Sequence, residues 1–347
     1  MSRHARLLQP DSRAWREALT AIRHDVYHLP SYVVMEADNL GGEAAAYYYK
    51  DGDRVFLLPL VVLPIPGTAL SDASSPYGYP GPTSNADPGD EPFWKAACNG
   101  LVEILASCSL VSCFVRLHPL LAVSLDALTS VGTLVEHGHT VSIDLTKSEE
   151  EMWSHVRPNH RRQINRARRD GAVVVVDQWD RLATFIEMYH ETMRRVGASS
   201  SYYFQRPYFD RLRTALGNRV HLVTVEFHET VAAGGIFLEC GEVFQYHLGA
   251  TRTPFLSRQP AKLMFDEVRR WAKSRGGLAL HLGGGVGGED NSLFHFKAGF
   301  SRDWQPFRTW RIVADSAAYR YLAHTSGAAT DDVGLLEFFP AYRRPTV

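Results

Sequence analysis

Hydrophobic and polar positions repeat with two different periods along the first half of the chain, which predicts a mixture of helices and strands. Residues 11–22 have the spacing of an amphipathic helix, with Asp11 or Ser12 as its N-cap. Residues 44–50 and 54–62 are apolar runs joined by an Asp-Gly turn, which is typical of a β-hairpin. The pattern then predicts a Pro-, Gly- and Ser-rich loop at 71–92, a helix at 92–107, and strands at 110–117 and 140–145.

The second half repeats this mixture in a more regular order. Ser148 and Glu151 form a capping box for a helix that breaks at Pro158 and ends near Gly171. The elements predicted after it are a strand, two helices, three antiparallel strands, a helix, a strand and a short helix, at 173–176, 180–196, 207–216, 220–227, 231–239, 243–248, 261–274, 278–282 and 291–298. This order resembles that of a GNAT-type acyltransferase domain, and the first half resembles a degenerate version of it.

The length agrees with this repetition, because 347 residues make about two domains of ~150 residues. We predict an α/β protein with mixed sheets, built from two tandem GNAT-like domains at 1–146 and 147–312. Two such domains are expected to pack around a central cleft, where ligands tend to bind. The C-terminal segment 313–347 is expected to pack back on the first domain.

Composition narrows the class of protein. Apolar residues make up 45% and charged residues 22%, so each half can bury a core, and disorder and coiled-coil rods are excluded. Lys and Arg number 37 against 38 Asp and Glu, a net charge of -1 that argues against indiscriminate nucleic-acid binding but allows a local basic patch. The four cysteines contain no CxxC pair, the N-terminal stretch lacks the apolar core of a signal peptide, and the apolar run 55–63 is too short to span a bilayer. We therefore expect a cytoplasmic protein without a membrane partner.

A glycine-rich segment follows the last long predicted strand. Residues 283–288 contain a G-x-G-x-x-G pattern, but the Lys-Ser/Thr of a P-loop is missing, and so are the acidic residue and the further units of a dinucleotide-binding fold. We interpret the segment as a loop that needs backbone freedom or close approach to a ligand, with Gly284 and Gly285 as candidate substrate-binding residues. A purely structural turn is the alternative.

Lys297 follows this loop on a short predicted helix, between Phe296 and Phe300, and it is one of only six lysines in the chain. The tetrahedral intermediate of acyl transfer carries an oxyanion, and a cation or N–H donor placed beside it stabilises it by ~3–4 kcal/mol. Lys297 is therefore a candidate catalytic residue. An ordinary surface lysine is the alternative.

Arginines concentrate in one predicted helix. Three of them share a helical face, opposite His160, Ile164 and Ala167, and such a row matches the phosphates of a nucleic-acid strand or a pyrophosphate. A solvated amphipathic face is the alternative. The three on one face are Arg162, Arg166 and Arg169, and the others nearby are Arg157, Arg161 and Arg168.

Two loops rich in aromatic residues, around Tyr77 and Tyr79 and around Tyr202 and Tyr203, could stack on a base or an acyl group, or could pack on their own domain. The 15 histidines show no metal-binding spacing, and no GxSxG elbow is present. We therefore expect neither a metal nor another cofactor, and metal hydrolases and esterases are disfavoured.

Several short strings, in the same order along residues 10–320, together resemble the FemABX-related family. The strings are 161–167, 246–248, 281–285 and 296–300 in the second half, and 77–79 and 116–119 in the first. The resemblance implies two GNAT-like domains with a cleft between them, and peptide-bond formation by transfer of an amino acid from aminoacyl-tRNA to an amine. It also implies that Phe296 and Lys297 lie at the reaction centre, and it adds Arg116 to the candidate substrate-binding residues.

A separate segment of the sequence bears on the identity of the donor. GNAT domains that use acyl-CoA bind its pyrophosphate on bare N–H groups of a glycine-containing turn before their central helix. The corresponding segment here, 256–262, has no glycine, and Pro260 removes one N–H donor. This favours aminoacyl-tRNA over acyl-CoA. The long helical arm of some cell-wall Fem proteins has no counterpart, because no segment sustains heptads.

We therefore predict a Fem-like transferase that joins an amino acid from aminoacyl-tRNA to an amine of a peptidyl acceptor, which is a precursor of an antibiotic or other peptide natural product, or of peptidoglycan. Tyr246 is expected to orient the acceptor, and the three-arginine face to bind the tRNA backbone. The general base is left open between Glu289, Asp290 and the substrate itself. An acyl-CoA-dependent N-acyltransferase and a non-catalytic binding module are the alternatives, and no DNA partner is expected.

Overall fold

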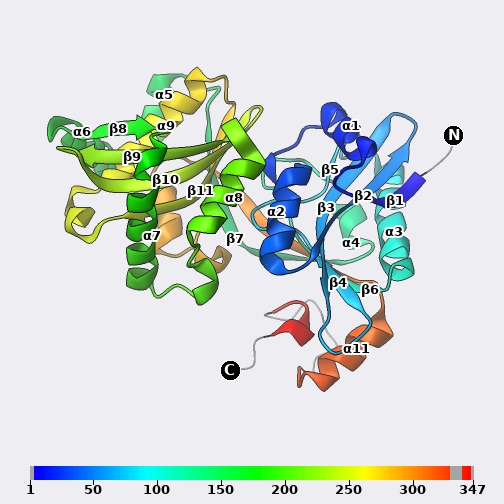
Figure 1. Ribbon diagram of the computed structural model, residues 1–347. Coiled ribbons are helices and arrows are strands. Elements are labelled where there is room, and N and C mark those ends of the chain that lie inside the picture. The colour runs from blue at the N-terminus through cyan, green and yellow to red at the C-terminus, as the bar shows by residue number, and fades with distance from the viewer. Residues whose placement is uncertain (1–3, 329–337, 345–347) are drawn as a thin grey trace. The chain divides into compact units, whose positions relative to one another are not determined.

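The computed structural model describes residues 4–328 and 338–344, and it divides into two compact units (Figure 1). Unit 1 comprises residues 1–137 and 307–347, and unit 2 comprises residues 138–306. The chain passes between the units within strands β7 (Thr133–Asp144) and β13 (Asp303–Val313). The sequence pattern predicts both boundaries later, at 146/147 and 312/313.

The sheet of unit 1 has the strand order β1-β2-β3-β4-β6-β13. All neighbours are antiparallel except β4 and β6, which are parallel, and the short strand β5 pairs with β3. Its other strands are β1 (His4–Leu8), β2 (Glu43–Asp51), β3 (Arg54–Pro64), β4 (Ser71–Ser74), β5 (Thr83–Ser84) and β6 (Leu110–Arg116). The stretch 71–92, predicted as a loop, thus contains two short strands, and this part of the prediction is wrong.

The sheet of unit 2 has the order β8-β9-β10-β11-β12-β7. Here too every pair is antiparallel except one, β11 with β12. Its other strands are β8 (Val173–Val176), β9 (Val220–Phe227), β10 (Thr230–Cys240), β11 (Val243–Thr251) and β12 (Ala279–Gly284). The two sheets therefore repeat one pattern of pairing, with the parallel pair in the same place.

The helices follow the same repetition. Unit 1 has two helices between its first two strands and one before β6, and unit 2 has two between β8 and β9 and one before β12. Those of unit 1 are α1 (Arg13–Ala21), α2 (Pro30–Leu40), α3 (Glu91–Ser107), α4 (Leu125–Thr129) and α11 (Ser316–Thr325). Those of unit 2 are α5 (Glu149–His155), α6 (Pro158–Arg169), α7 (Leu182–Val196), α8 (Arg206–Leu216), α9 (Pro260–Ser274) and α10 (Ser292–Lys297). Short 3₁₀ turns are η1 (Val26–His28), η2 (Trp179–Arg181), η3 (Ser200–Tyr202), η4 (Gly217–Arg219), η5 (Thr253–Arg258), η6 (Val286–Gly288) and η7 (Ala341–Arg343).

Helices cover both faces of each sheet. In unit 2, the neighbouring residues Gly234 and Gly235 of β10 approach side chains of α7 and α9 respectively. Successive residues of a strand point to opposite faces, so α7 and α9 lie on opposite sides of the sheet. In unit 1, Tyr47 and Tyr49 pack in the cluster with α3, whereas Tyr48 packs with α1 and α2. Each fully buried apolar side chain contributes about 1.5–3 kcal/mol to these cores.

The end of the chain packs within unit 1. Tyr319 and Leu322 of α11 and Ala341 of η7 form a small core with Ile65 and Val111. The remainder of this segment, 329–337 and 345–347, lies outside the described residues.

Candidate active site

The candidate catalytic residues of unit 2 meet where its two parallel strands part. β11 and β12 are paired as far as Gln245 and His281, whose side chains share a hydrogen bond of 2.7 Å. Both strands continue past this pair without pairing to each other, and Tyr246 on β11 and Gly284 on β12 lie just beyond it. Ligand sites of α/β proteins commonly lie past the carboxyl ends of such strands.

Lys297 reaches this place from α10. Its Nζ donates a hydrogen bond to the carbonyl oxygen of Gly284 at 2.6 Å and lies 5.5 Å from the centre of the Tyr246 ring. The side chain is 6% exposed, and burial lowers the pKa of Lys297 to about 7. No carboxylate among the described residues forms an ion pair with it. An ammonium has three N–H groups, so this buried group keeps hydrogen-bonding capacity for a ligand.

The Tyr246 ring beside the lysine belongs to a cluster of aromatic side chains. Phe265 of α9 contacts the rings of Tyr246, Phe296 and Phe300, with centroid distances of 4.7, 5.8 and 5.2 Å. Burial also raises the pKa of Tyr246, which keeps its phenol neutral. A weakly polar environment strengthens the attraction between a cation and a developing negative charge. The structure thus brings Lys297, Tyr246, Phe296 and Gly284 together.

Helix α10 is held at both ends. Asn291 caps its start by accepting hydrogen bonds from two backbone N–H groups. At its other end, His160 of α6 donates from Nε2 to the carbonyl of Phe296 at 3.0 Å, and Arg157 donates from Nη1 to the carbonyl of His295 at 3.2 Å. Gly299 lies so close to the His160 ring that a Cβ there would overlap with it. These contacts fix the position of the lysine at the end of the helix.

The glycine-rich loop needs its glycines for conformation. Gly283, Gly287 and Gly288 have φ values of 74°, 68° and 87°, in the left-handed region that disfavours other residues. A side chain at Gly285 would overlap with the carbonyl oxygen of Glu289. The requirement for backbone freedom therefore has a structural cause, and the contact of Gly284 and Gly285 with substrate stays a prediction.

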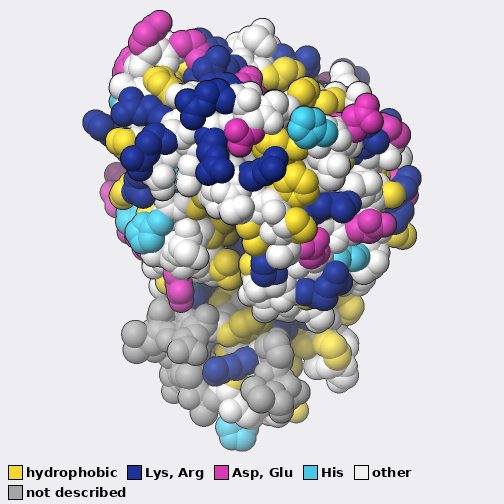
Figure 2. Space-filling view, turned by 90° about the vertical axis from the view of Figure 1, so that its left-hand side faces the viewer, with side chains coloured by type: hydrophobic (Ala, Val, Ile, Leu, Met, Phe, Trp, Pro, Cys, Tyr) yellow, Lys and Arg dark blue, Asp and Glu magenta, His cyan; other side chains and the backbone are white. Residues whose placement is uncertain are grey.

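The arginines of the α6 region have different roles. Arg168 is half-buried and paired with Asp266 and Glu267 of α9 at 2.5 and 2.6 Å, so its charge is used within unit 2. The three arginines predicted to share a face are all exposed, and Arg166 lies 3.5 Å from Asp170. The opposite face is buried, as predicted. Figure 2 views the side of the molecule that bears α6 and shows Lys and Arg side chains gathered in its upper half.

The residues predicted in the second aromatic loop lie elsewhere in unit 2. Tyr189 of α7 donates a hydrogen bond to the carbonyl of Tyr202 at 2.8 Å, and the ring of Tyr203 lies 5.9 Å from that of His190. Tyr202 is exposed, and in the described structure neither tyrosine contacts Lys297. A role for them in binding substrate stays a prediction.

The candidate residues of unit 1 occupy the equivalent place in its own sheet. The parallel strands β4 and β6 are paired as far as Ser74 and Phe114. Tyr77 and Tyr79 follow β4 directly, and Arg116 ends β6. Tyr79 contacts the ring of Phe307 at 5.6 Å. Both units therefore carry their candidate side chains where their parallel strands part, a relation that a linear sequence pattern does not reveal.

This loop lies near a buried pair to which the sequence pattern assigns no role. His118 and Asp25 are joined by a hydrogen bond of 2.9 Å, and both side chains are fully buried. The backbone N–H of Gly81 bonds to the carbonyl of Arg116 at 2.9 Å and fixes the other end of the loop.

Comparison with known proteins agrees with this architecture. Residues 154–297 match the family model described as an acetyltransferase (GNAT) domain. The crystal structure of FemX superimposes with a TM-score of 0.73 at 14% identity, over 92% of this chain and 99% of that one. The chain has the fold of FemX. This confirms the predicted fold class and, at the level of fold, the resemblance to the FemABX-related family, and together with the GNAT match it supports an acyltransferase.

Two further solved structures share the fold. The C-terminal domain of a putative lysylphosphatidylglycerol synthetase from Agrobacterium fabrum has a TM-score of 0.56 at 13% identity, over 91% of this chain and 98% of that one. L-PGS from Bacillus licheniformis has a TM-score of 0.52 at 13% identity, over 87% and 92%. No curated protein sequence matches the chain.

Lys262 is a second buried lysine, to which the sequence pattern assigns no role. It lies near the start of α9, is 5% exposed, donates a hydrogen bond to Gln163 and lies 5.9 Å from the Phe296 ring. Burial lowers its pKa. The residues next to Lys262 in the sequence do not indicate that it is buried. The small number of lysines in the chain is the sequence signal that could have drawn attention to it.

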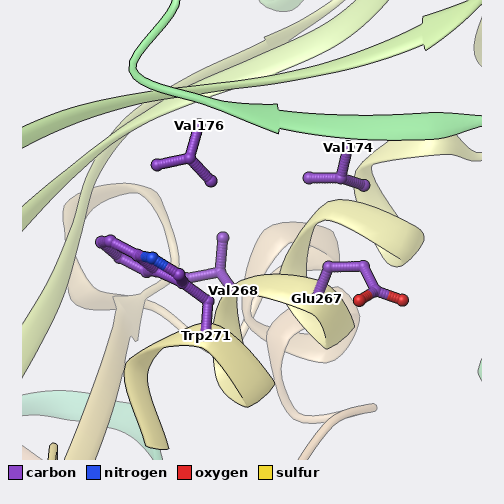
Figure 3. A pocket seen from close by; sticks show the side chains of 5 residues that line it. All are labelled: Val174, Val176, Glu267, Val268 and Trp271. Carbon is purple, nitrogen blue, oxygen red and sulfur yellow. The ribbon is translucent and has the colours of Figure 1, made fainter. Parts of the chain in front are cut away.

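The pocket between β8 and α9 carries none of the candidate residues. It has a volume of about 170 Å³ and is lined by Val174, Val176, Glu267, Val268 and Trp271 (Figure 3). Its one carboxylate is already paired with Arg168. None of the residues that line this largely apolar pocket belongs to the lysine site.

Two further observations concern the described part of the chain as a whole. None of its helices combines the length and the apolar composition that crossing a lipid bilayer requires. Its His, Cys, Asp and Glu side chains form no group of three or more that could bind a metal.

Proposed function

We propose that this protein is a Fem-like aminoacyltransferase, which transfers an amino acid from aminoacyl-tRNA to an amine of a peptidyl acceptor and so forms a peptide bond. The observation that carries the proposal is the buried ammonium of Lys297, which lies where the parallel strands of a GNAT domain part and has no carboxylate partner among the described residues.

The proposed reaction uses this geometry. The amine nitrogen attacks the carbonyl carbon of the aminoacyl ester, and the carbonyl oxygen becomes an oxyanion. Lys297 donates an N–H to that oxyanion, a contact that contributes ~3–4 kcal/mol to the stability of the transition state. The bond to the ribose oxygen then breaks. The ribose oxygen takes its electron pair and one proton, and the amine nitrogen loses one proton. The ester is already activated, so alignment of the two substrates supplies much of the rate and no covalent enzyme intermediate is needed.

The choice of donor rests on two features. Arg162, Arg166 and Arg169 are exposed along one face of α6, and successive turns 5.4 Å apart suit contacts with consecutive phosphates. At the start of α9, Gln259 has a left-handed conformation and Pro260 supplies no N–H, which disfavours the pyrophosphate contacts of an acyl-CoA. One protein of similar fold also bears the name of a lysylphosphatidylglycerol synthetase, and this name describes an aminoacyl compound as its product.

The proposed acceptor is a peptidyl amine that the enzyme binds in the cytoplasm. It belongs to a precursor of an antibiotic, of another peptide natural product or of peptidoglycan. Tyr246 would orient it from β11. Tyr77, Tyr79 and Arg116 of unit 1 are proposed as substrate-binding residues. These assignments follow the resemblance and the position of each side chain at the end of a parallel strand pair.

The experiment is a transfer assay with total tRNA charged with one labelled amino acid at a time, offered to mixed small peptides and peptidoglycan precursors. We expect an amide product that disappears when the tRNA is digested with RNase beforehand. Lys297→Met is expected to lower turnover by ~100-fold or more, whereas Lys95→Met, a change at an exposed lysine on α3, leaves it unchanged. Product formed from acetyl-CoA after RNase treatment would instead identify an acyl-CoA-dependent enzyme, and no product with any donor would favour a binding module.

A further inference from the structure

A second pocket of unit 2 has a composition that the lysine site does not explain. It has a volume of about 250 Å³ and lies beside α10, with Ala298, the residue after Lys297, in its wall. Three arginines line it: Arg157 and Arg161 at the start of α6, and Arg302 just before β13. The lining contains no Asp or Glu.

No carboxylate of the described residues is paired with the arginines of this pocket. In the described residues, the side chains of Arg161 and Arg302 form no hydrogen bond or ion pair. Arg157 donates one N–H of its guanidinium to the carbonyl of His295, so the other N–H groups of the guanidinium are available to a ligand. Asp303 lies next to Arg302 in the sequence, but its carboxylate is bonded to Lys147 at 3.0 Å. Three guanidiniums without a carboxylate are suited to a multiply charged anion, and phosphate is the anion that their geometry matches best.

An aromatic side chain completes the wall. Trp304 lines the pocket and is 45% exposed, which is unusual for so large an apolar ring. Its orientation is fixed, because its Nε1 donates to the carbonyl of Ser301 at 3.1 Å and its ring contacts Phe294 edge to face. A rigid, exposed indole beside arginines offers a stacking surface for a planar group.

The size of the pocket limits its ligand. Sites for drug-sized molecules have volumes of about 300–1,000 Å³, so a pocket of this size suits a ligand no larger than one nucleoside monophosphate. We infer that this pocket binds a nucleoside phosphate, with the phosphate against Arg157, Arg161 and Arg302 and the base against Trp304. The further identification of this ligand as one nucleotide of the RNA donor rests on the proposed function.

The inference can be tested by titrating the full chain with CMP, AMP, cytidine and inorganic phosphate, by calorimetry and by tryptophan fluorescence at low salt. The two monophosphates are expected to bind more tightly than cytidine or phosphate. Arg161→Ala with Arg302→Ala is expected to weaken both monophosphates and phosphate about tenfold or more. Neither side chain has a protein partner among the described residues, so the fold should tolerate the change.

Trp304 supplies the test of stacking. Trp304→Ala is expected to weaken the monophosphates about 5- to 100-fold while the affinity for inorganic phosphate stays the same, and Trp304→Phe is expected to restore most of the loss. Arg194→Ala, which removes an exposed arginine of α7 outside the pocket, is the matched control and should change nothing. Equal binding of cytidine and CMP, or unchanged binding in the double arginine variant, would overturn the inference.

A transfer assay separates this inference from the proposed function. If the pocket variants raise KM for charged tRNA, the nucleotide belongs to the donor. If CMP binds as expected but no charged tRNA is used, the pocket stands and the proposed function fails. If transfer occurs and the pocket variants bind CMP and use tRNA like the wild type, the pocket inference fails and the proposed function stands.

Discussion

Replacing Lys297 by methionine is expected to make the fold more stable while it removes activity, because the wild-type protein buries an ammonium at a cost. The pKa of Lys297 falls from its usual value to about 7, and each pKa unit corresponds to about 1.4 kcal/mol. At pH 7 the buried lysine therefore destabilises the folded state by about 4 kcal/mol relative to a neutral group. Losing its hydrogen bond to the carbonyl of Gly284 offsets about 1–2 kcal/mol of the gain. We expect the free energy of unfolding of Lys297→Met to exceed that of the wild type by about 2–3 kcal/mol.

The dependence on pH identifies the cause. In the unfolded chain the lysine stays protonated up to about pH 10, whereas in the folded chain it loses its proton near pH 7. The buried lysine therefore destabilises the fold fully below pH 7, and this destabilisation disappears as the pH rises toward 10. Urea denaturation of both proteins at pH 7, 8, 9 and 10 should show the advantage of the variant shrinking steadily. Lys95→Met, at an exposed site, should show no such trend. A variant less stable than the wild type at pH 7, or an advantage that does not change with pH, would refute this reasoning.

Two other predictions concern charge on α6 and buried histidines. Changing both Arg162 and Arg166 to Glu is expected to weaken tRNA binding and to flatten its dependence on salt, because each lost phosphate contact removes about 0.7–0.9 from the slope of log K against log salt. Arg194→Glu is the control. Equal slopes in the variant and the wild type would mean that these arginines form a solvated face that does not bind tRNA. The wild-type fold is expected to lose stability as the pH falls from 6.5 toward 4, because burial lowers the pKa of His160 and of His247 to about 4, so that the unfolded chain takes up protons first. The free energy of unfolding at pH 7 should exceed that at pH 4.5 by about 1–3 kcal/mol per histidine. The same free energy of unfolding at both pH values would contradict this.

The elements with a strong local pattern could be predicted from the sequence. The β2–β3 hairpin, the β9–β10–β11 meander and helices α3 and α9 lie close to their predicted positions. Helix α2 escapes prediction because its buried residues are not confined to one stripe. Strand β13 escapes it because Pro306 and several half-buried polar residues interrupt the alternation. In these segments tertiary packing decides the structure, and a local pattern cannot report it.

The site was predictable only in part, for a related reason. The resemblance points to Lys297, Phe296 and Tyr246, and the fold places them within one cluster. It does not indicate that the lysine is buried, because its neighbours Tyr246 and Gly284 come from β11 and β12, beyond the point where these strands cease to pair. The helical spacing separates the three arginines on one face of α6 from the others, but it does not reveal partners distant in the sequence, such as Asp266 for Arg168.

The contacts between α6 and α10 connect the proposed binding of the donor with the proposed chemistry. His160 and Arg157 hold the carbonyl groups at the end of α10, one residue or two from Lys297, and Gly299 is small enough to let the two segments approach. The same stretch of α6 lines the arginine pocket and continues into the exposed arginine face. An enzyme gains rate when binding energy from a remote part of the substrate is used to fix the reacting groups. Phosphate contacts on α6 can be used in this way here, because the helix that would receive them is bonded to the segment that aims the ammonium.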